Sequence, residues 1–195
     1  MKIQKPNSKQ PIPKHAKRVF RGIIFDTYQW KQKLYDGSYV TFEKIKRKST
    51  VGVLPITKNG QIILTEQTQP PNYKFLGLLG GIVDDKDKNE DILLAAKREL
   101  AEEAGLKAEK WILWYAIQVF EKVEWSIYNF IAKDLTKIKV ENPDKGEKIK
   151  LLYVSFNEFI QMTAQENFRD SEIALKIYQL KGSKKLTETK KLFLT

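Results

Sequence analysis

The sequence predicts an α/β (α+β) protein, in which a mixed β-sheet lies between helical layers and a small antiparallel β appendage precedes it. Three observations predict this class. Asp36-Gly37 and Asn59-Gly60 are hairpin signals, each flanked by segments rich in β-branched and apolar residues. Apolar residues recur at helical spacing between positions 90 and 104. Strand-like segments occur before and after this helix, which favours a layered arrangement.

The N-terminal third is divided by its proline and turn residues. Residues 1–17 contain three prolines and no hydrophobic periodicity, which predicts a basic flexible tail. Residues 18–48 are predicted to form a β-hairpin subdomain, with strands at 19–30 and 38–45. The main domain is expected at 49–181, and it begins with an apolar strand and a second hairpin.

The helix at 90–104 is the best-defined element of the main domain. Its apolar face, at spacings of three and four residues, consists of Leu93, Ala96, Leu100 and Ala104. Gly105 follows at once, and glycine is the usual residue for a left-handed C-cap. The glycine-rich segment 75–83 comes before the helix and predicts backbone that passes close to another group.

Three strands and two helices are predicted after this helix. The strands are expected at 111–120, 124–132 and 151–156. Ser155 and Glu158 form a capping box that begins a helix extending to about Gln165. Asp170 is the predicted N-cap of a last helix. Residues 182–195 are rich in lysine and are predicted to be a basic C-terminal tail.

Composition narrows the chemistry open to this chain of 195 residues. It has no cysteine, so disulfides, thiolate catalysis and cysteine-ligated zinc are excluded. Its single histidine, His15, lies in the proline- and lysine-rich start, which argues against Ser-His-Asp catalysis and against a histidine-based metal site. A metal site in this chain must therefore be built from carboxylates.

The formal net charge of +11 belongs to the two ends of the chain. Residues 1–21 carry seven basic residues and no acid, residues 181–195 carry five lysines and one glutamate, and residues 22–180 are neutral in sum. Basic ends attract polyanions such as RNA. They are equally typical of solvated tails, which is the interpretation that the sequence favours.

The sequence predicts a cytoplasmic protein without a membrane segment. No apolar run follows the basic start, as a secretory signal would require. The longest nearly unbroken apolar segment, 111–120, is far shorter than the ~20 residues that span a bilayer.

The polar side of the predicted helix carries an unusual cluster of acids. Glu99, Glu102 and Glu103 lie within an arc of roughly 100°. Like charges at these spacings repel by roughly a few tenths of a kcal/mol per pair, and near a helix C-terminus they also oppose the helix dipole. These penalties predict a compensating cation, and hard oxygen ligands suit Mg²⁺, with Mn²⁺ as a close substitute. The alternative is a solvated acidic helix face.

These residues resemble a known motif, the Nudix box of the Nudix hydrolases, written G-x5-E-x7-R-E-U-x-E-E-x-G-U with U aliphatic. The matching positions are Gly81, Glu90, Arg98-Glu99-Leu100, Glu102-Glu103, Gly105 and Leu106. From Glu90 onward the match is complete. Eight residues separate Gly81 from Glu90 where the family has five, which predicts a lengthened loop before the helix.

The order of elements over roughly residues 18–180 is similar to the ADP-ribose pyrophosphatase branch of that family. This resemblance implies a Nudix-like α/β/α sandwich and a homodimer that exchanges its N-terminal strands. A Gly-Glu-x-Ile stretch in the family's catalytic loop is matched by Gly146-Glu147-Lys148-Ile149. Glu147 alone would be taken for a surface acid in a turn, and the resemblance makes it a candidate for the general base or for orienting the attacking water.

The resemblance also implies roles for the other residues. Glu99, Glu102 and Glu103 would hold the metal together with the backbone carbonyl of Gly80, and Arg98 would orient the acids. Gly81 for close approach and Arg47 for phosphate charge are the expected substrate-binding residues. A nucleobase or sugar also needs a flat apolar wall, which Tyr28 or Phe25 could supply, with core packing as the alternative for each aromatic residue. Gln69 stands where the branch often has an arginine, so Arg47 and Lys48, or Lys74, are the candidates to supply that charge.

The implied function is metal-dependent hydrolysis of a pyrophosphate bond in a nucleoside diphosphate linked to another moiety, such as ADP-ribose or a nucleotide sugar. Two alternatives stay open at this point. One is removal of pyrophosphate from a nucleoside triphosphate or an RNA 5′ end. The other is a non-catalytic nucleotide-binding module, although binding alone does not require three clustered carboxylates.

Overall fold

A computed structural model describes residues 3–83, 91–139 and 148–194 of the chain. The elements, in chain order, are β1 Lys17–Arg21, β2 Phe25–Lys33, β3 Tyr39–Arg47, β4 Thr50–Pro55, β5 Ile62–Gln69, β6 Tyr73–Gly77, β7 Leu79–Ile82, α1 Ile92–Ala104, β8 Leu106–Gln118, β9 Val123–Glu124, β10 Ser126–Lys137, β11 Lys148–Val154, α2 Phe156–Met162, α3 Ser171–Gly182 and α4 Leu186–Leu194. None of the helices in the described ranges is long and apolar enough to cross a membrane.

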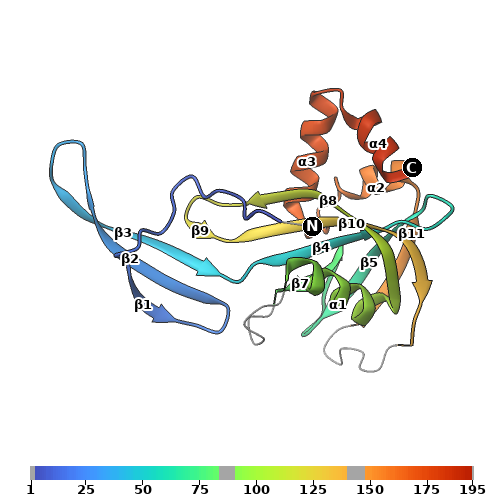
Figure 1. Cartoon of the computed structure of the whole chain (residues 1–195), viewed down its shortest axis with the longest axis horizontal. Helices are drawn as coiled ribbons and strands as arrows, with labels where there is room; N and C mark the ends of the chain where they lie inside the picture. The colour runs from blue at the N-terminus through green and yellow to red at the C-terminus, as the bar shows by residue number, and fades with distance from the viewer. Residues whose placement is uncertain (1–2, 84–90, 140–147, 195) are drawn as a thin grey trace.

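The N-terminal strands form an appendage that projects from the body of the molecule (Figure 1). Its sheet has the order β1-β2-β3-β9, with β1, β2 and β3 antiparallel and the short β9 parallel to β3. The strand predicted at 19–30 is in fact two strands. The chain turns between them, where Gly22 N–H donates to Phe25 O at 2.9 Å.

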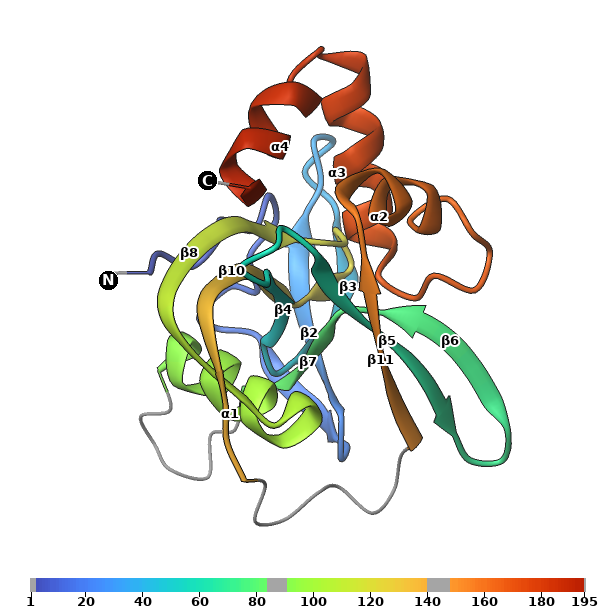
Figure 2. The same ribbon diagram turned by 90° about the vertical axis from the view of Figure 1, so that its right-hand side faces the viewer.

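The body contains a mixed sheet between helices, as predicted. Its order is β7-β4-β10-β8, with β4 parallel to β10 and the other pairs antiparallel. A further sheet has the order β11-β5-β6. Figure 2 shows α1 on one side of these strands and α2, α3 and α4 on the other.

Strand β4 contributes to two hydrophobic cores, because it lies between the helical layers. Val51 and Val53 belong to the core that packs against α1. Leu54 belongs to the core that packs against α2, α3 and α4. The helices on the two sides therefore rest on one shared strand, which fixes their relative positions.

The C-terminal segment corrects the tail predicted at 182–195. Residues 186–194 form α4, and the Phe193 ring is fully buried. It packs edge-on against Trp114 and Phe156 at centroid distances of 5.2 and 5.4 Å and stacks on Phe159 at 6.0 Å. Lys133 Nζ donates to the carbonyl of Leu192 at 2.8 Å. The surface lysines conceal this helix in the sequence, and long-range aromatic contacts hold it.

The segment before β1 lies along the appendage without helix or strand structure from Pro6 to Ala16. The buried Lys44 Nζ donates to Ser8 Oγ at 3.0 Å and to the Gln10 carbonyl. Ile12 N–H donates to Glu124 at 3.2 Å. These bonds give the segment a defined position that its composition did not predict.

Candidate active site

Helix α1 forms as predicted, because both of its ends are capped and one face is apolar. The Asp91 side chain accepts a bond from Leu93 N–H at the first turn. Gly105 ends the helix with φ 62°, in the left-handed region that glycine favours. Ala96 and Leu100 are fully buried in the core that contains Val51. The opposite polar face is thereby directed into a cavity of about 1050 Å³.

Arg98 organises the acids on that polar face. Its Nη1 donates to Glu99 Oε1 at 2.8 Å and to Glu102 Oε2 at 3.0 Å. Its Nη2 donates to the carbonyl of Ile82 at 2.9 Å. The guanidinium therefore offsets the repulsion between two carboxylates and ties them to the end of β7.

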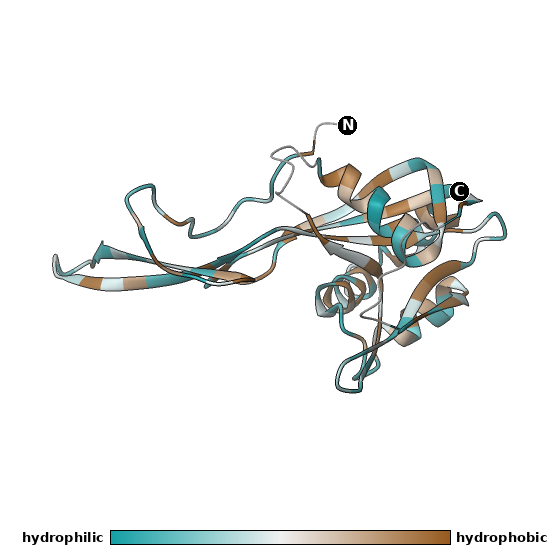
Figure 3. Cartoon of the chain, turned by 90° about the horizontal axis from the view of Figure 1, so that it is seen from below, coloured by the Kyte–Doolittle hydropathy of each residue, from teal (hydrophilic) through white to brown (hydrophobic). Residues whose placement is uncertain are grey.

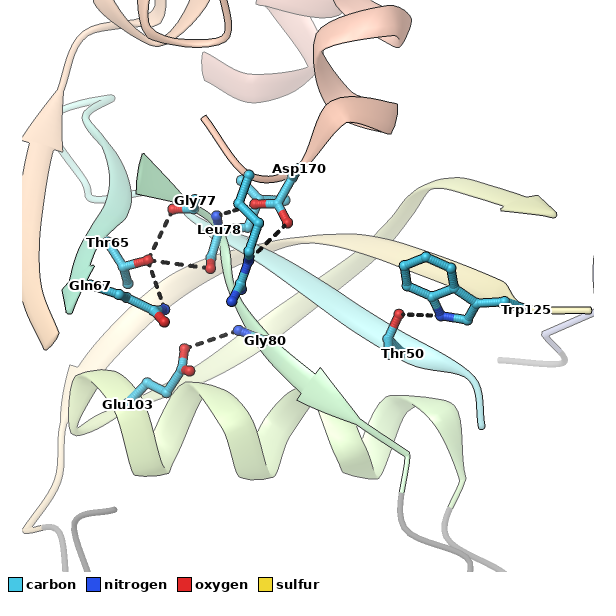
Figure 4. Close-up of polar contacts among 10 residues, drawn as sticks. Thr50, Thr65, Gln67, Gly77, Leu78, Gly80, Glu103, Trp125 and Asp170 are labelled. Atoms are coloured by element: carbon cyan, nitrogen blue, oxygen red, sulfur yellow. Dashed lines mark hydrogen bonds and ion pairs between the residues drawn. The ribbon is translucent and has the colours of Figure 1, made fainter. Parts of the chain in front are cut away.

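The two glycines of β7 allow this strand to lie directly against the acids. Gly80 N–H donates to Glu103 Oε2 at 2.9 Å (Figure 4). Gly80 has φ 150°, and a Cβ there would overlap the carbonyl oxygen of Val51. A Cβ on Gly81 would overlap the carboxylate of Glu99. Close approach, as the sequence predicted, is what requires glycine at both positions.

A second wall of the cavity is basic and aromatic. The Arg47 guanidinium lies 4.2 Å from the ring centroid of Trp125 and 5.6 Å from that of Phe25. The Trp125 indole is fixed in turn, because its N–H donates to Thr50 Oγ1 at 3.0 Å (Figure 4). Within the described part of the chain, the buried Arg47 Nε has no hydrogen-bond partner.

A third wall comes from the start of α3. Asp170 is the N-cap residue of α3, as predicted, but its side chain makes no cap bond to the helix and instead accepts from Leu78 N–H at 2.6 Å. Burial raises the pKa of Asp170. Burial likewise raises the pKa of Glu172 from 4.5 to about 7, and the neighbouring Asp170 adds to this rise. The protonated form of such a carboxyl group, which dominates below its raised pKa, can donate a hydrogen bond as well as accept one.

Comparison with known proteins identifies the chain. The family model of the NUDIX domain matches residues 46–176. The chain belongs to the NUDIX family. It is 26% identical to the methanol dehydrogenase activator of Bacillus methanolicus over 169 residues, which cover 85% of this chain and 89% of that protein. It is 24% identical to the ADP-ribose pyrophosphatase of Bacillus subtilis (strain 168) over 168 residues, which cover 84% and 88%.

The fold of this Nudix protein also matches a solved structure. The crystal structure of an ADP compounds hydrolase superimposes with a TM-score of 0.70 at 19% sequence identity. The match covers 93% of this chain and 100% of that chain. This neighbour supports the Nudix-like sandwich predicted from the sequence.

Nudix hydrolases generally use a divalent metal, and the carboxylate oxygens of α1 are the type of ligand that such an ion prefers. Three carboxylates and the backbone of Gly80 line one cavity and offer hard oxygen donors. As the side chains stand, no three metal-binding groups in residues 3–83, 91–139 and 148–194 converge on one point. The reason is that Arg98 bridges Glu99 and Glu102, while Glu103 accepts from Gly80.

Most of the predicted site residues of this Nudix chain meet in one cavity. Its lining includes Gly80, Gly81, Arg98, Glu99, Glu102, Glu103 and Arg47. Tyr28 lies on β2 and is not part of this lining. Glu90, Glu147 and the lengthened loop at 84–89 lie outside the described residues.

The cavity also contains residues that the sequence did not indicate: Gln67, Trp125, Asn129, Arg169 and Glu172. Asn129 carried the one usable signal, since it is a polar residue inside the apolar run of β10. It is fully buried, and neither amide atom has a hydrogen-bond partner in the described part of the chain. Gly52 makes room for it, because a Cβ on Gly52 would overlap Asn129 Oδ1.

Proposed function

We propose that this Nudix hydrolase cleaves the pyrophosphate bond of a nucleoside diphosphate joined to a sugar, with ADP-ribose as the first candidate. The observation that carries this proposal is the pairing of two different walls in one cavity. The carboxylates of α1 form one wall, and Arg47 beside Trp125 forms another. The relative named as an ADP-ribose pyrophosphatase and the structural neighbour named as an ADP compounds hydrolase support this choice.

On the acidic wall, we assign Glu99, Glu102, Glu103 and the carbonyl of Gly80 as ligands of Mg²⁺, with Mn²⁺ as a substitute. When bound there, the metal supplies an activated water and neutralises charge on the phosphates. Arg98 is the positioning residue, because it already bonds two of these carboxylates. Glu147 is proposed as the general base on the family resemblance alone.

On the other wall, Arg47 is the proposed phosphate ligand, since its guanidinium is held between two aromatic rings. Because Gly81 has no side chain, it allows the substrate to come close to the backbone of β7. The apolar side chains of Ile23, Ile24 and Phe120 line the same cavity and are more than half exposed. A nucleobase is flat and apolar on its faces, and such side chains would cover it.

The appendage supports a homodimer with exchanged N-terminal strands. Val19, Phe20 and Phe25 lie on β1 and β2 and are exposed, and Figure 3 shows apolar stretches along this thin projection. Apolar surface of this kind is typical of a protein interface. In the dimer, Tyr28 would serve the partner's cavity rather than its own. The proposed location is the cytoplasm.

A substrate panel tests the function. We expect the protein to release AMP from ADP-ribose with Mg²⁺ or Mn²⁺ but not with EDTA, as measured by anion-exchange chromatography. Glu103→Gln should lower the rate by at least about 100-fold. The matched control Glu109→Gln changes an exposed glutamate outside the cavity and should keep full activity. Preferential cleavage of nucleoside triphosphates or capped RNA would contradict the substrate class, and no cleavage across the panel would favour a binding module.

A further inference from the structure

Arg169 reaches the cavity from the loop before α3, and its position is fixed at both backbone and side chain. Arg169 N–H donates to the carbonyl of Leu76 at 2.8 Å. The guanidinium lies over the Phe75 ring, 4.2 Å from its centroid, and Nε is 3.9 Å from Asp170 Oδ1. A guanidinium that stacks through its face keeps its edge N–H groups available for a planar or tetrahedral anion.

Its place beside the acidic wall follows from a short chain of contacts through β7. Asp170 accepts from Leu78 N–H at 2.6 Å, and two residues later Gly80 N–H donates to Glu103 at 2.9 Å. Figure 4 shows Asp170 on one side of this stretch of backbone and Glu103 on the other. Only the three residues from Leu78 to Gly80 therefore lie between Asp170, which neighbours Arg169, and Glu103, one of the proposed metal ligands.

The cavity also contains the basic residues Arg98, Arg47 and Lys48. Arg98 is engaged by Glu99, Glu102 and the Ile82 carbonyl. Arg47 lies on the aromatic wall beside Trp125. A diphosphate that reaches the acids brings further negative charge to the start of β7, and the Arg169 side chain there is 36% exposed.

We propose that Arg169 binds a phosphate group of the substrate, and that Phe75 and Asp170 hold its guanidinium ready for this contact. The inference rests on the proposed function, since it concerns the diphosphate of that substrate. It gives the cavity phosphate-binding arginines on two walls, so that the two phosphates of one substrate are held separately. Substrates with a single phosphate gain only one of these contacts.

Substitution of Arg169 tests the proposal through binding as well as turnover. Calorimetry with ADP-ribose in EDTA measures affinity without hydrolysis, and steady-state rates with Mg²⁺ measure KM and kcat. Arg169→Gln should weaken ADP-ribose binding about 10- to 100-fold, because one charge-assisted contact is lost. AMP shows which phosphate Arg169 holds, because its affinity falls by the same factor if Arg169 holds the phosphate next to the nucleoside and stays unchanged if Arg169 holds the other. The ADP-ribose affinity of Arg169→Lys should lie between those of the wild type and Arg169→Gln, since lysine keeps the charge but loses the fork of donors.

Two controls separate a direct contact from a structural effect. Lys176 lies on α3 outside the cavity, and its ammonium group lies over the ring of Tyr115, so Lys176→Gln removes a comparable cation–ring contact and should leave binding unchanged. Added guanidinium ion should partly restore ADP-ribose binding by Arg169→Ala, which a merely folding defect would not allow. Equal ADP-ribose affinity in wild type and Arg169→Gln would overturn the inference. If the wild type binds ADP-ribose in an Arg169-dependent way but cleaves nothing, the inference stands and the proposed function fails.

Discussion

Glu172 should make the stability of this protein fall as the pH rises from about 5 to about 7. Burial and the nearby Asp170 raise the pKa of Glu172 from 4.5 to about 7 in the folded chain. Between these two values the folded state holds a proton that the unfolded state has lost. The shift corresponds to about 3 kcal/mol, which is present as stability below pH 4.5 and is lost once the pH passes 7.

The substitution Glu172→Gln removes this dependence while it keeps the shape of the side chain. At pH 8 the variant should be more stable than the wild type by about 2–3 kcal/mol, and near pH 4.5 the two should be equal. Urea unfolding followed by tryptophan fluorescence, at half-unit steps from pH 4.5 to 8.5, measures the difference. Ser171→Ala, a neutral neighbour that also lines the cavity, should retain the wild-type pH profile. A difference between Glu172→Gln and wild type that is constant with pH, or that shrinks as the pH rises, would refute the reasoning.

Three further substitutions have expected outcomes. Gly81→Ala should lower Mg²⁺-dependent kcat/KM by at least about tenfold, because the new Cβ displaces the Glu99 carboxylate; an unchanged Mg²⁺ titration would contradict this. Phe193→Ala should cost about 3–5 kcal/mol in urea unfolding, whereas a true C-terminal tail would tolerate it without loss. Gly105→Ala forces a left-handed conformation on alanine and should cost about 1 kcal/mol; equal thermal midpoints would argue against the cap.

Much of the fold could be predicted, because its signals are local. The spacing of Leu93, Ala96 and Leu100 defines α1 without knowledge of any other element. The capping box of Ser155 and Glu158 is formed as predicted. In contrast, α4 depends on Phe193 reaching aromatic rings from β8 and α2, which no local pattern reveals.

The candidate site divides in the same way. The residues on α1 share one helix, so their spacing alone places them together. Arg169, Glu172 and Asn129 come from a loop, a helix and a strand that meet only in the folded chain. The substrate-binding role of Tyr28 and the catalytic role of Glu147 stay predictions, because Tyr28 lies away from the cavity of its own chain and Glu147 is outside the described residues.

The arrangement of charge explains why the net charge of +11 says little about the proposed substrate. Within the cavity, both signs of charge are present, since its lining includes the acids of α1 together with Arg47, Arg98 and Arg169. A polyanion such as RNA is bound best by a continuous basic surface, and the carboxylates of α1 interrupt any such surface here. A short diphosphate is suited to both signs at once, because arginines can bind its oxygens while carboxylates would hold the cation that offsets its charge. The segment from Leu78 to Gly80 positions one group of each kind. Leu78 bonds Asp170, whose carboxylate lies 3.9 Å from Arg169 Nε, and Gly80 bonds Glu103.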